Sequence, residues 1–376
     1  MKYPKFKLEN YLAEREFNAP FNLCASDLET LSMKEVIQMA DDEGQKLWNK
    51  LRLHYTEPKG LPELRHEIAK LYEEPINSNN VLCFAGAEEG IYSAMHALLE
   101  PSDHAIIITP CYQSLESLPT AICSTTTVAL QYPTQWQIDL DRIKDAIQFN
   151  TKLLVINFPH NPTGALISQE QQQRLVELAR KHKMWIFSDE VYRLLEIDPT
   201  DRIPPMASIY EKGLSLSVMS KAYGLAGLRV GWIACQNVAV LDKIGEIKHY
   251  LSICNSAPSE ILSLIALRAS DNIHARNARL MQKNLSLLDN FFQDYSEWFE
   301  WIRPKGGCIG YPLFKGKKSI DTIAEELLKE VGVLILPSSI YDHPGNHFRI
   351  SFGRSSMPEA LERLIHYINQ RKQEWR

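Results

Sequence analysis

Short apolar runs, each bounded by turn residues, alternate along the chain with stretches of helical periodicity. The runs show little polar alternation, which is typical of parallel strands covered on both faces. We predict strands at residues 104–110, 152–159, 184–191, 213–220 and 229–235. We predict helices at residues 87–100, 137–148 and 167–183. This alternation predicts an α/β fold, with a mostly parallel central sheet and helices on both faces.

The pattern changes from about residue 257 onward. Residues 259–292 contain neither Gly nor Pro, and their periodicity predicts one long helix that bridges two parts of the chain. The rest of the chain reads as α+β, with strand-like pieces at 306–314 and 332–337 and helices at 321–331 and 357–372. We therefore predict a large domain over residues 45–275 and a smaller α+β domain made of residues 1–44 and 276–376.

The composition narrows the class of protein. The chain has 376 residues, of which 45% are hydrophobic, and a formal net charge of -5. An acidic balance argues against a nucleic-acid partner, which needs a basic footprint. The seven cysteines are widely spaced without a C-x-x-C motif, so we expect neither disulfides nor a metal site and favour a cytoplasmic protein. The N-terminus has no signal-like apolar region, and no run approaches the roughly 18 apolar residues of a membrane span.

Lys221 stands at the end of a predicted strand, in the segment SVMSKAYGLAGLRVGW. A lysine near buried surface can have a lowered pKa and attack a carbonyl group. Taken alone, a surface lysine is the more common interpretation. However, Arg229 follows after two glycines, Gly224 and Gly227, and such a stretch can bring backbone and guanidinium groups close to a phosphate. These neighbouring residues favour the interpretation of Lys221 as a catalytic lysine.

Three further motifs also stand at strand ends. Asp189, in IFSDEVY, would face the usual ligand crevice of an open α/β sheet, or else cap a helix. Asn161, in NFPHNPTG, would point into the same crevice, or else belong to an ordinary Pro-Gly turn. The turn FAGAEEG opens a helix with Gly86, Ala87 and Glu88, whose N–H groups could reach a phosphate, although a generic glycine turn reads similarly. Asn161, Asp189 and Lys221 follow one another at intervals of about one βαβ unit, and the order of the four motifs is more specific than any one of them.

With these motifs in this order, the sequence resembles the class I/II aminotransferases, which are enzymes of fold type I that depend on pyridoxal 5'-phosphate (PLP). The resemblance implies three catalytic residues: Lys221, Asp189 and Tyr192. It implies that the following residues bind the cofactor: Lys221, Asp189, Asn161, Tyr192, Tyr112, Gly86, Ala87, Glu88, Arg229, Ser220 and Tyr55. It implies that the substrate is bound by Arg349, Asn161 and Ser26.

The resemblance also implies a role for each group. Lys221 would form the Schiff base with PLP and then transfer the proton, while Asp189 would pair with the ring nitrogen. Asn161 and Tyr192 would bond the ring hydroxyl, and Tyr112 would stack on the ring. The amino group would pass from an L-amino acid to a 2-oxo acid by a ping-pong mechanism.

The remaining implied roles lie at the two ends of the cofactor and substrate. Arg229 and the N–H groups of the helix start would hold the phosphate. Tyr55 would reach the phosphate of a neighbouring subunit, which implies a homodimer. Arg349, in HFRISFG, would bind the substrate carboxylate through a bidentate pair, although an edge-strand surface charge is the alternative. Arg354 is a lesser candidate for the same task.

Two positions depart from the family pattern. Val218 stands where a Ser or Thr hydroxyl usually binds phosphate, so Ser217 or Ser220 would have to replace it. Glu88 stands at another position that is often Ser or Thr, and its carboxylate would repel a phosphate. Both departures suggest a looser phosphate site than usual.

The substrate stays open at this point. Residues 22–33 are expected to border the pocket, where Asp27 and Glu29 could receive a basic side chain but are better read as solvated loop acids. This stretch also resembles the capreomycidine synthase branch, which acts on a hydroxylated arginine. The alternative function is therefore a PLP enzyme that does not transaminate: a C–S or β-eliminating lyase, an oxidase or a cyclase. A PLP-like sensor would need a DNA-binding extension, and a dehydrogenase would need G-x-G-x-x-G, and neither occurs.

Overall fold

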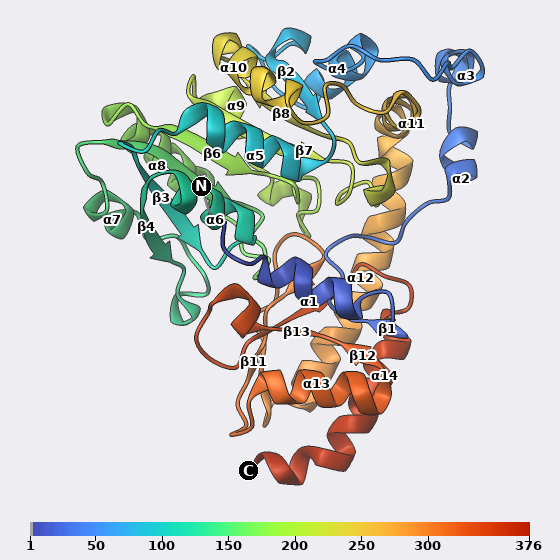
Figure 1. Cartoon of the computed structure of the whole chain (residues 1–376). Helices are drawn as coiled ribbons and strands as arrows, with labels where there is room; N and C mark the ends of the chain where they lie inside the picture. The colour runs from blue at the N-terminus through green and yellow to red at the C-terminus, as the bar shows by residue number, and fades with distance from the viewer. Residues whose placement is uncertain (1–2) are drawn as a thin grey trace.

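A computed structural model describes residues 3–376 of the chain. Its largest element is a seven-stranded sheet in the order β2-β8-β7-β6-β5-β3-β4, which fills the upper part of Figure 1. The bounds are β2 Val81–Phe84, β3 His104–Thr109, β4 Ser124–Ala129, β5 Thr151–Asn157, β6 Trp185–Asp189, β7 Gly213–Val218 and β8 Gly231–Cys235. The five predicted strands are thus present, and the α/β fold with a mostly parallel sheet is confirmed.

Three features of the sheet differ from the prediction. β8 runs antiparallel to both β7 and β2, although its apolar run resembles those of the parallel strands. β2 was not predicted, because it is a run of only four residues. β4 was not predicted either, because its sequence STTTVA is mostly polar and only one of its residues, Val128, is buried at the sheet edge.

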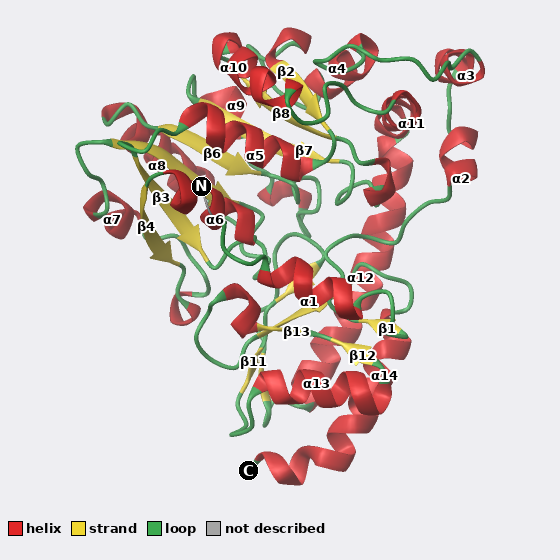
Figure 2. Cartoon of the chain, viewed as in Figure 1, coloured by secondary structure: helices red, strands yellow, loops and turns green. Residues whose placement is uncertain are grey.

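Helices cover both faces of the sheet (Figure 2). Successive residues of β5 alternate between two cores: Leu153 and Val155 belong to one, Leu154 and Ile156 to the other. The first core includes α5 (Ala87–Leu98) and α10 (Val238–His249), and the second includes α8 (Gln169–Lys181). The apolar runs therefore lack polar alternation because each strand is buried on both sides.

The predicted helix starts are largely confirmed. The α8 helix begins after a capping box, in which the Ser168 side chain accepts from Gln171 and the Gln171 side chain accepts from Ser168. α7 spans only Leu140–Asp145, which is shorter than the predicted range. The predicted long helix is wrong: α11 (Ala257–Arg268) and α12 (Ser270–Asp294) are separated at Ala269, whose ψ of 15° interrupts the first helix.

The lower part of Figure 1 combines the two ends of the chain. There β1 (Phe21–Asn22) pairs in parallel with β12 (Val333–Leu334). A three-stranded sheet has the order β10-β14-β13, and β11 pairs with β9. The bounds are α1 Lys7–Arg15, β9 Phe299–Glu300, β10 Ile309–Gly310, β11 Leu313–Phe314, α13 Ile320–Val331, β13 Leu336–Pro337, β14 Phe348–Ser351 and α14 Met357–Arg371. α12 runs from beside α11 down to these elements and crosses the predicted domain boundary at residue 275, which stays a prediction.

The remaining helices lie around the large sheet. Their bounds are α2 Met33–Gln38, α3 Asp42–Asn49, α4 Pro62–Ala69, α6 Gln113–Ile122 and α9 Met206–Ile209. Within residues 3–376, none of the helices combines the length and the hydropathy needed to cross a membrane. The parallel strands β5, β6 and β7 end side by side, with Asn157 paired to Asp189, and this edge faces the lower part of the chain.

Candidate active site

A pocket of about 160 Å³ lies at the carboxyl ends of the parallel strands, with α1 on its other side. Open α/β sheets usually bind ligands at this edge. Most of the residues predicted from the sequence line it: Lys221, Asp189, Asn161, Tyr192, Tyr112, Ala87, Glu88, Arg229, Ser220, Arg349 and Ser26. Gly86 adjoins it as the N-cap of α5, and Tyr55 does not reach it within one chain.

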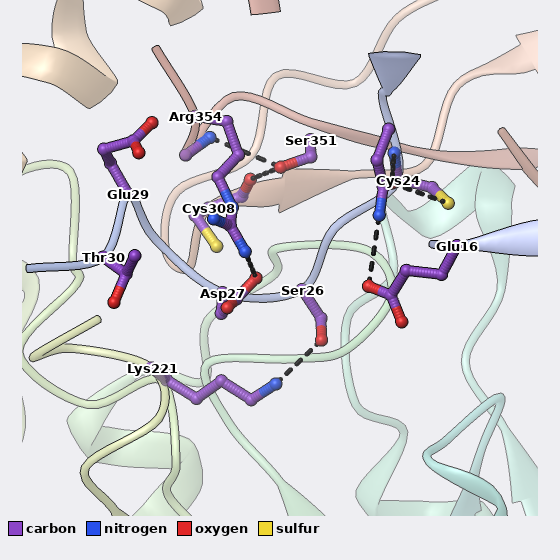
Figure 3. Close-up of polar contacts among 12 residues, drawn as sticks. Glu16, Cys24, Ser26, Asp27, Glu29, Thr30, Lys221, Cys308, Ser351 and Arg354 are labelled. Atoms are coloured by element: carbon purple, nitrogen blue, oxygen red, sulfur yellow. Dashed lines mark hydrogen bonds and ion pairs between the residues drawn. The ribbon is translucent and has the colours of Figure 1, made fainter. Parts of the chain in front are cut away.

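Lys221 follows β7 and points toward the segment after β1, as Figure 3 shows. Its Nζ donates a hydrogen bond to Ser26 Oγ over 2.8 Å. Burial lowers the pKa of Lys221, while the nearby carboxylate of Asp27 opposes this change. A buried amine with a lowered pKa supplies the neutral form that attacks carbonyl carbon.

Asp189 is the last residue of β6, and its side chain is buried. Its carboxylate accepts a hydrogen bond from the Val191 N–H over 3.1 Å, so part of the predicted capping role is present. Burial nevertheless raises the pKa of Asp189 to about 7, against the opposing effects of this N–H and of Lys221. A carboxylate that is so poorly solvated gains from a cationic partner in the pocket.

The phosphate end of the pocket lies where α5 begins. Gly86 has a φ of 90°, and a Cβ on it would stand only 2.4 Å from Arg229 Nη2, so glycine is required there. Arg229 itself has a φ of 52° and ends its turn beside this helix start. The arrangement offers a guanidinium and the free N–H groups of the first turn of α5 to an anion.

Both departures from the family pattern lie in this part of the pocket. Val218 lines it with an apolar side chain, and Ser220 is the neighbouring hydroxyl that also lines it. Glu88 turns toward α6, where its Oε1 accepts from Ser114 Oγ over 2.5 Å. Burial raises the pKa of Glu88, and the nearby Glu9 adds to this effect. The raised pKa of Glu88 lessens the tendency of this carboxyl group to ionise, in a place where a charged one would repel phosphate.

Arg349 is 1% exposed, so its interpretation as a surface charge is wrong. It stands on β14, and its Nε and Nη2 donate to the Cys24 carbonyl over 3.1 and 2.7 Å. Its Nη1 donates to the Tyr341 hydroxyl over 2.7 Å. A guanidinium has five N–H donors, so two remain for a carboxylate in the pocket.

The pocket tyrosines are fixed by hydrogen bonds. Tyr192 is fully buried, and its hydroxyl donates to the Ser26 carbonyl over 2.7 Å, with its ring 5.7 Å from Lys221 Nζ. Tyr112 is partly buried, and its hydroxyl donates to Glu9 Oε1 over 3.0 Å. Glu9 lies on α1 and was not predicted, because nothing in that helix marks it in the sequence as part of a pocket.

The loop acids after β1 are not free. Asp27 forms an ion pair of 2.6 Å with Arg354, and both side chains are largely buried (Figure 3). Glu29 accepts hydrogen bonds from the N–H and the hydroxyl of Ser355. Our interpretation of both residues as solvated acids is therefore wrong. Arg354 is engaged by Asp27 and does not line the pocket, which leaves Arg349 as the cation for a carboxylate.

Tyr55 lies in a different place. Its side chain is 81% exposed, next to Leu53 (87%) and within reach of the segment that carries Tyr250 (89%). The two segments adjoin, because Thr56 Oγ1 donates to the Asn255 carbonyl and Lys248 Nζ to the Pro58 carbonyl. Exposed apolar side chains gathered in this way are typical of a protein–protein interface.

The donor set fits PLP. One pocket is lined by the buried acid Asp189, by Lys221 with its lowered pKa, by the ring of Tyr112, and by the helix start with Arg229. The acid fits the pyridinium nitrogen of PLP, the amine its aldehyde, the aromatic side chain its ring face, and the helix start with Arg229 its phosphate. Fold and site together are those of a fold type I PLP enzyme.

Comparison with known proteins identifies the family. The sequence pattern of "Aminotransferase class I and II" matches residues 19–368, and the chain belongs to this family. The expected resemblance and the expected cofactor are thereby confirmed: the protein is a PLP-dependent transferase that moves amino groups between amino acids and 2-oxo acids.

Three similar proteins illustrate the range of the family. An aspartate aminotransferase of Thermotoga maritima is 28% identical and covers 88% of this chain and 87% of its own. A capreomycidine synthase of Streptomyces vinaceus is 27% identical and covers 98% of this chain and 93% of its own. A PLP-dependent aminotransferase of Streptococcus suis superposes with a TM-score of 0.92 at 26% identity, covering 98% of this chain and 99% of its own.

Proposed function

We propose that the pocket around Lys221 is the active site of an amino-acid aminotransferase. The observation that carries this proposal is the position of Lys221 Nζ in one pocket with the buried carboxylate of Asp189 and the buried guanidinium of Arg349. PLP, when bound, supplies a conjugated cationic ring that stabilises negative charge at the substrate Cα. Binding, orientation and proton transfer would be carried out by residues of the protein.

Asp189 and Lys221 would act on protons. Asp189 would keep the ring nitrogen protonated, because an ion pair with that N–H relieves the cost of burying its carboxylate. Lys221, whose pKa is lowered by burial, would take the proton from the substrate Cα and return it to the cofactor carbon. Tyr192 and Asn161 would orient the ring, and Tyr112 would cover one face of it.

Arg349 would hold the α-carboxylate of the substrate. Its two remaining N–H groups suffice for a bidentate contact, and the Cys24 carbonyl and Tyr341 hold the guanidinium plane in place. Ser26 would border the substrate, since its hydroxyl already accepts from Lys221 Nζ. Arg229, Ser220 and the start of α5 would bind the phosphate.

We also propose a homodimer in which Tyr55 reaches the pocket of the partner subunit. The supporting observation is the exposed apolar surface formed by Leu53, Tyr55, Tyr250, Leu251 and Ile253. A cytoplasmic location is proposed as well, because all seven cysteines are free.

A second candidate is a PLP enzyme that acts on a basic amino acid without transaminating it. Glu9 favours it, because this carboxylate lines the pocket and, within residues 3–376, its hydrogen-bond partner is Tyr112 alone. A capreomycidine synthase, from the branch that the sequence locally resembles, is among the relatives. Incubation with single amino acids separates the two candidates: formation of a 2-oxo acid and pyridoxamine phosphate supports the aminotransferase.

The test of the site is reductive trapping. PLP-loaded protein treated with borohydride should carry the cofactor covalently on the peptide that contains Lys221, as mass spectrometry can show. Lys221→Ala should lose this label. Lys318→Met, which alters a partly buried lysine that does not line the pocket, should keep it. A label that persists in Lys221→Ala would overturn the proposed site.

A further inference from the structure

One tyrosine joins the two polar groups that the proposed site assigns to cofactor and substrate. Tyr341 ends the short turn Ser338–Tyr341 after β13, and its side chain is buried. Its hydroxyl lies 2.7 Å from Arg349 Nη1 and 3.0 Å from Asn161 Oδ1. It thus links β14 of the lower part to the strand end that carries Asn161.

The direction of each hydrogen bond follows from the donor inventory. Arg349 carries only N–H donors, so the Tyr341 oxygen must accept from it. The single hydroxyl hydrogen of Tyr341 is then free to donate, and the other contact of Tyr341 is Asn161. The atom of Asn161 on this side must therefore be the carbonyl oxygen. Its Nδ2 consequently faces the pocket as a donor, and no described residue accepts from it.

We propose that Tyr341 is a positioning residue, which fixes the amide of Asn161 with its N–H group toward the ring hydroxyl of the cofactor and holds Arg349 for the substrate carboxylate. The proposal rests on the proposed active site. Under this proposal, the orientation of the Asn161 amide, which binds the cofactor, depends through Tyr341 on Arg349, which binds the substrate.

The surroundings limit this effect to the side chain of Asn161. The Asn161 N–H donates to Asn157 Oδ1 over 2.8 Å, and Asn157 Nδ2 donates to the Asp189 carbonyl over 2.9 Å. The backbone at Asn161 is therefore anchored to β5 and β6 without Tyr341. Loss of the Tyr341 hydroxyl should leave the loop in place and release only the rotation of the amide.

Tyr341 also stays a donor over the useful pH range. Burial raises the pKa of Tyr341 to about 12, although Arg349 opposes this change. Its ring packs against Tyr311, with the ring centroids 5.9 Å apart. Tyr311 provides a matched control, because it is also buried and, among the described residues, its hydroxyl forms no hydrogen bond with Arg349 or Asn161.

The experiment compares Tyr341→Phe with Tyr311→Phe in the full-length protein. In Tyr341→Phe, the dissociation constant for PLP, measured by equilibrium dialysis, should rise about tenfold, as expected for one misdirected hydrogen bond to a charged group. The pH midpoint of the visible absorption change of the bound cofactor should move upward by about one unit, because the ring oxygen anion loses a donor. The KM for the amino donor should rise more than kcat falls. Tyr311→Phe should change none of these quantities.

A double-mutant cycle tests whether Tyr341 acts through Asn161. In the Asn161→Ala background, Tyr341→Phe should no longer change the PLP dissociation constant or the absorption midpoint, since the two effects share one pathway. Equal behaviour of Tyr341→Phe and Tyr311→Phe, or full additivity in the cycle, would overturn the proposal. A borohydride label that persists in Lys221→Ala, by contrast, would show that the proposed active site itself has failed, so the two failures can be told apart.

Discussion

Replacing Asp189 by Asn should stabilise the protein without cofactor, and bound cofactor should reduce this gain in stability. The amide keeps the size of the carboxyl group and its contact with the Val191 N–H, but it removes a buried group that ionises. Burial raises the pKa of Asp189 from 3.8 to about 7. An acid with a raised pKa binds more protons in the folded than in the unfolded chain between these two values, so stability falls as the pH rises through this window.

The size of the effect follows from the two pKa values. The change from 3.8 to about 7 corresponds to roughly 4 kcal/mol at full ionisation. Between pH 5 and pH 8 alone, the ionisation of Asp189 should lower the free energy of unfolding of the wild type by roughly 2.5 kcal/mol. The free energy of unfolding of cofactor-free Asp189→Asn, minus that of the wild type, should therefore increase by about this amount between pH 5 and pH 8.

Urea unfolding of both cofactor-free proteins, at equal protein concentration and at both pH values, measures this difference. The subtraction removes the contribution of other groups that titrate in both proteins. With saturating PLP the advantage of Asp189→Asn should shrink by about 1.5–3 kcal/mol, because the wild-type carboxylate then has a cationic partner. A difference that stays constant between pH 5 and pH 8 would refute the assignment of Asp189 as a poorly solvated, unpaired acid.

Three other substitutions test other parts of the site. Burial raises the pKa of Glu88, so this carboxyl group ionises as the pH rises, and the affinity of the wild type for PLP should then fall. Glu88→Gln should not show this fall, and equilibrium dialysis at pH 9 should find that it binds PLP about tenfold more tightly than the wild type. Arg349→Lys should raise the KM for the amino donor about 10- to 100-fold with a smaller change in PLP affinity, because lysine cannot form the bidentate contact; equal changes in both would contradict its role. Leu53→Asp should yield monomers in light scattering and lower the PLP affinity, whereas the same substitution at Phe149, another exposed apolar residue, should do neither.

The parts of the fold that follow from local sequence were predictable. Short apolar runs gave the positions of β3, β5, β6, β7 and β8, because each of these strands is buried on both faces. The direction of β8 was not predictable, since a strand buried on both faces has the same composition whether it runs parallel or antiparallel. The break at Ala269 carries no Gly or Pro signal, so it depends on how α11 and α12 pack in the folded chain.

The residues of the candidate site were likewise predictable only in part. Residues that stand at strand ends, such as Lys221 and Asp189, could be predicted because the sheet brings such ends together. Glu9 and Tyr341 could not, because each reaches the pocket from a segment far away in sequence. The ion pair of Asp27 with Arg354 was missed for the same reason, since only the tertiary fold places the two side chains together.

The pairing of β1 with β12 has a consequence for how the chain folds during synthesis. The residues just after β1 supply the Cys24 carbonyl that holds Arg349 and the Ser26 hydroxyl that meets Lys221, yet β12, the strand that anchors them, is made only after all seven strands of the large sheet. The first strand must therefore wait, with its edge unpaired, until β12 leaves the ribosome. A chain that stops before β12 can build the large sheet with its lysine and aspartate, but it cannot close the substrate end of the pocket.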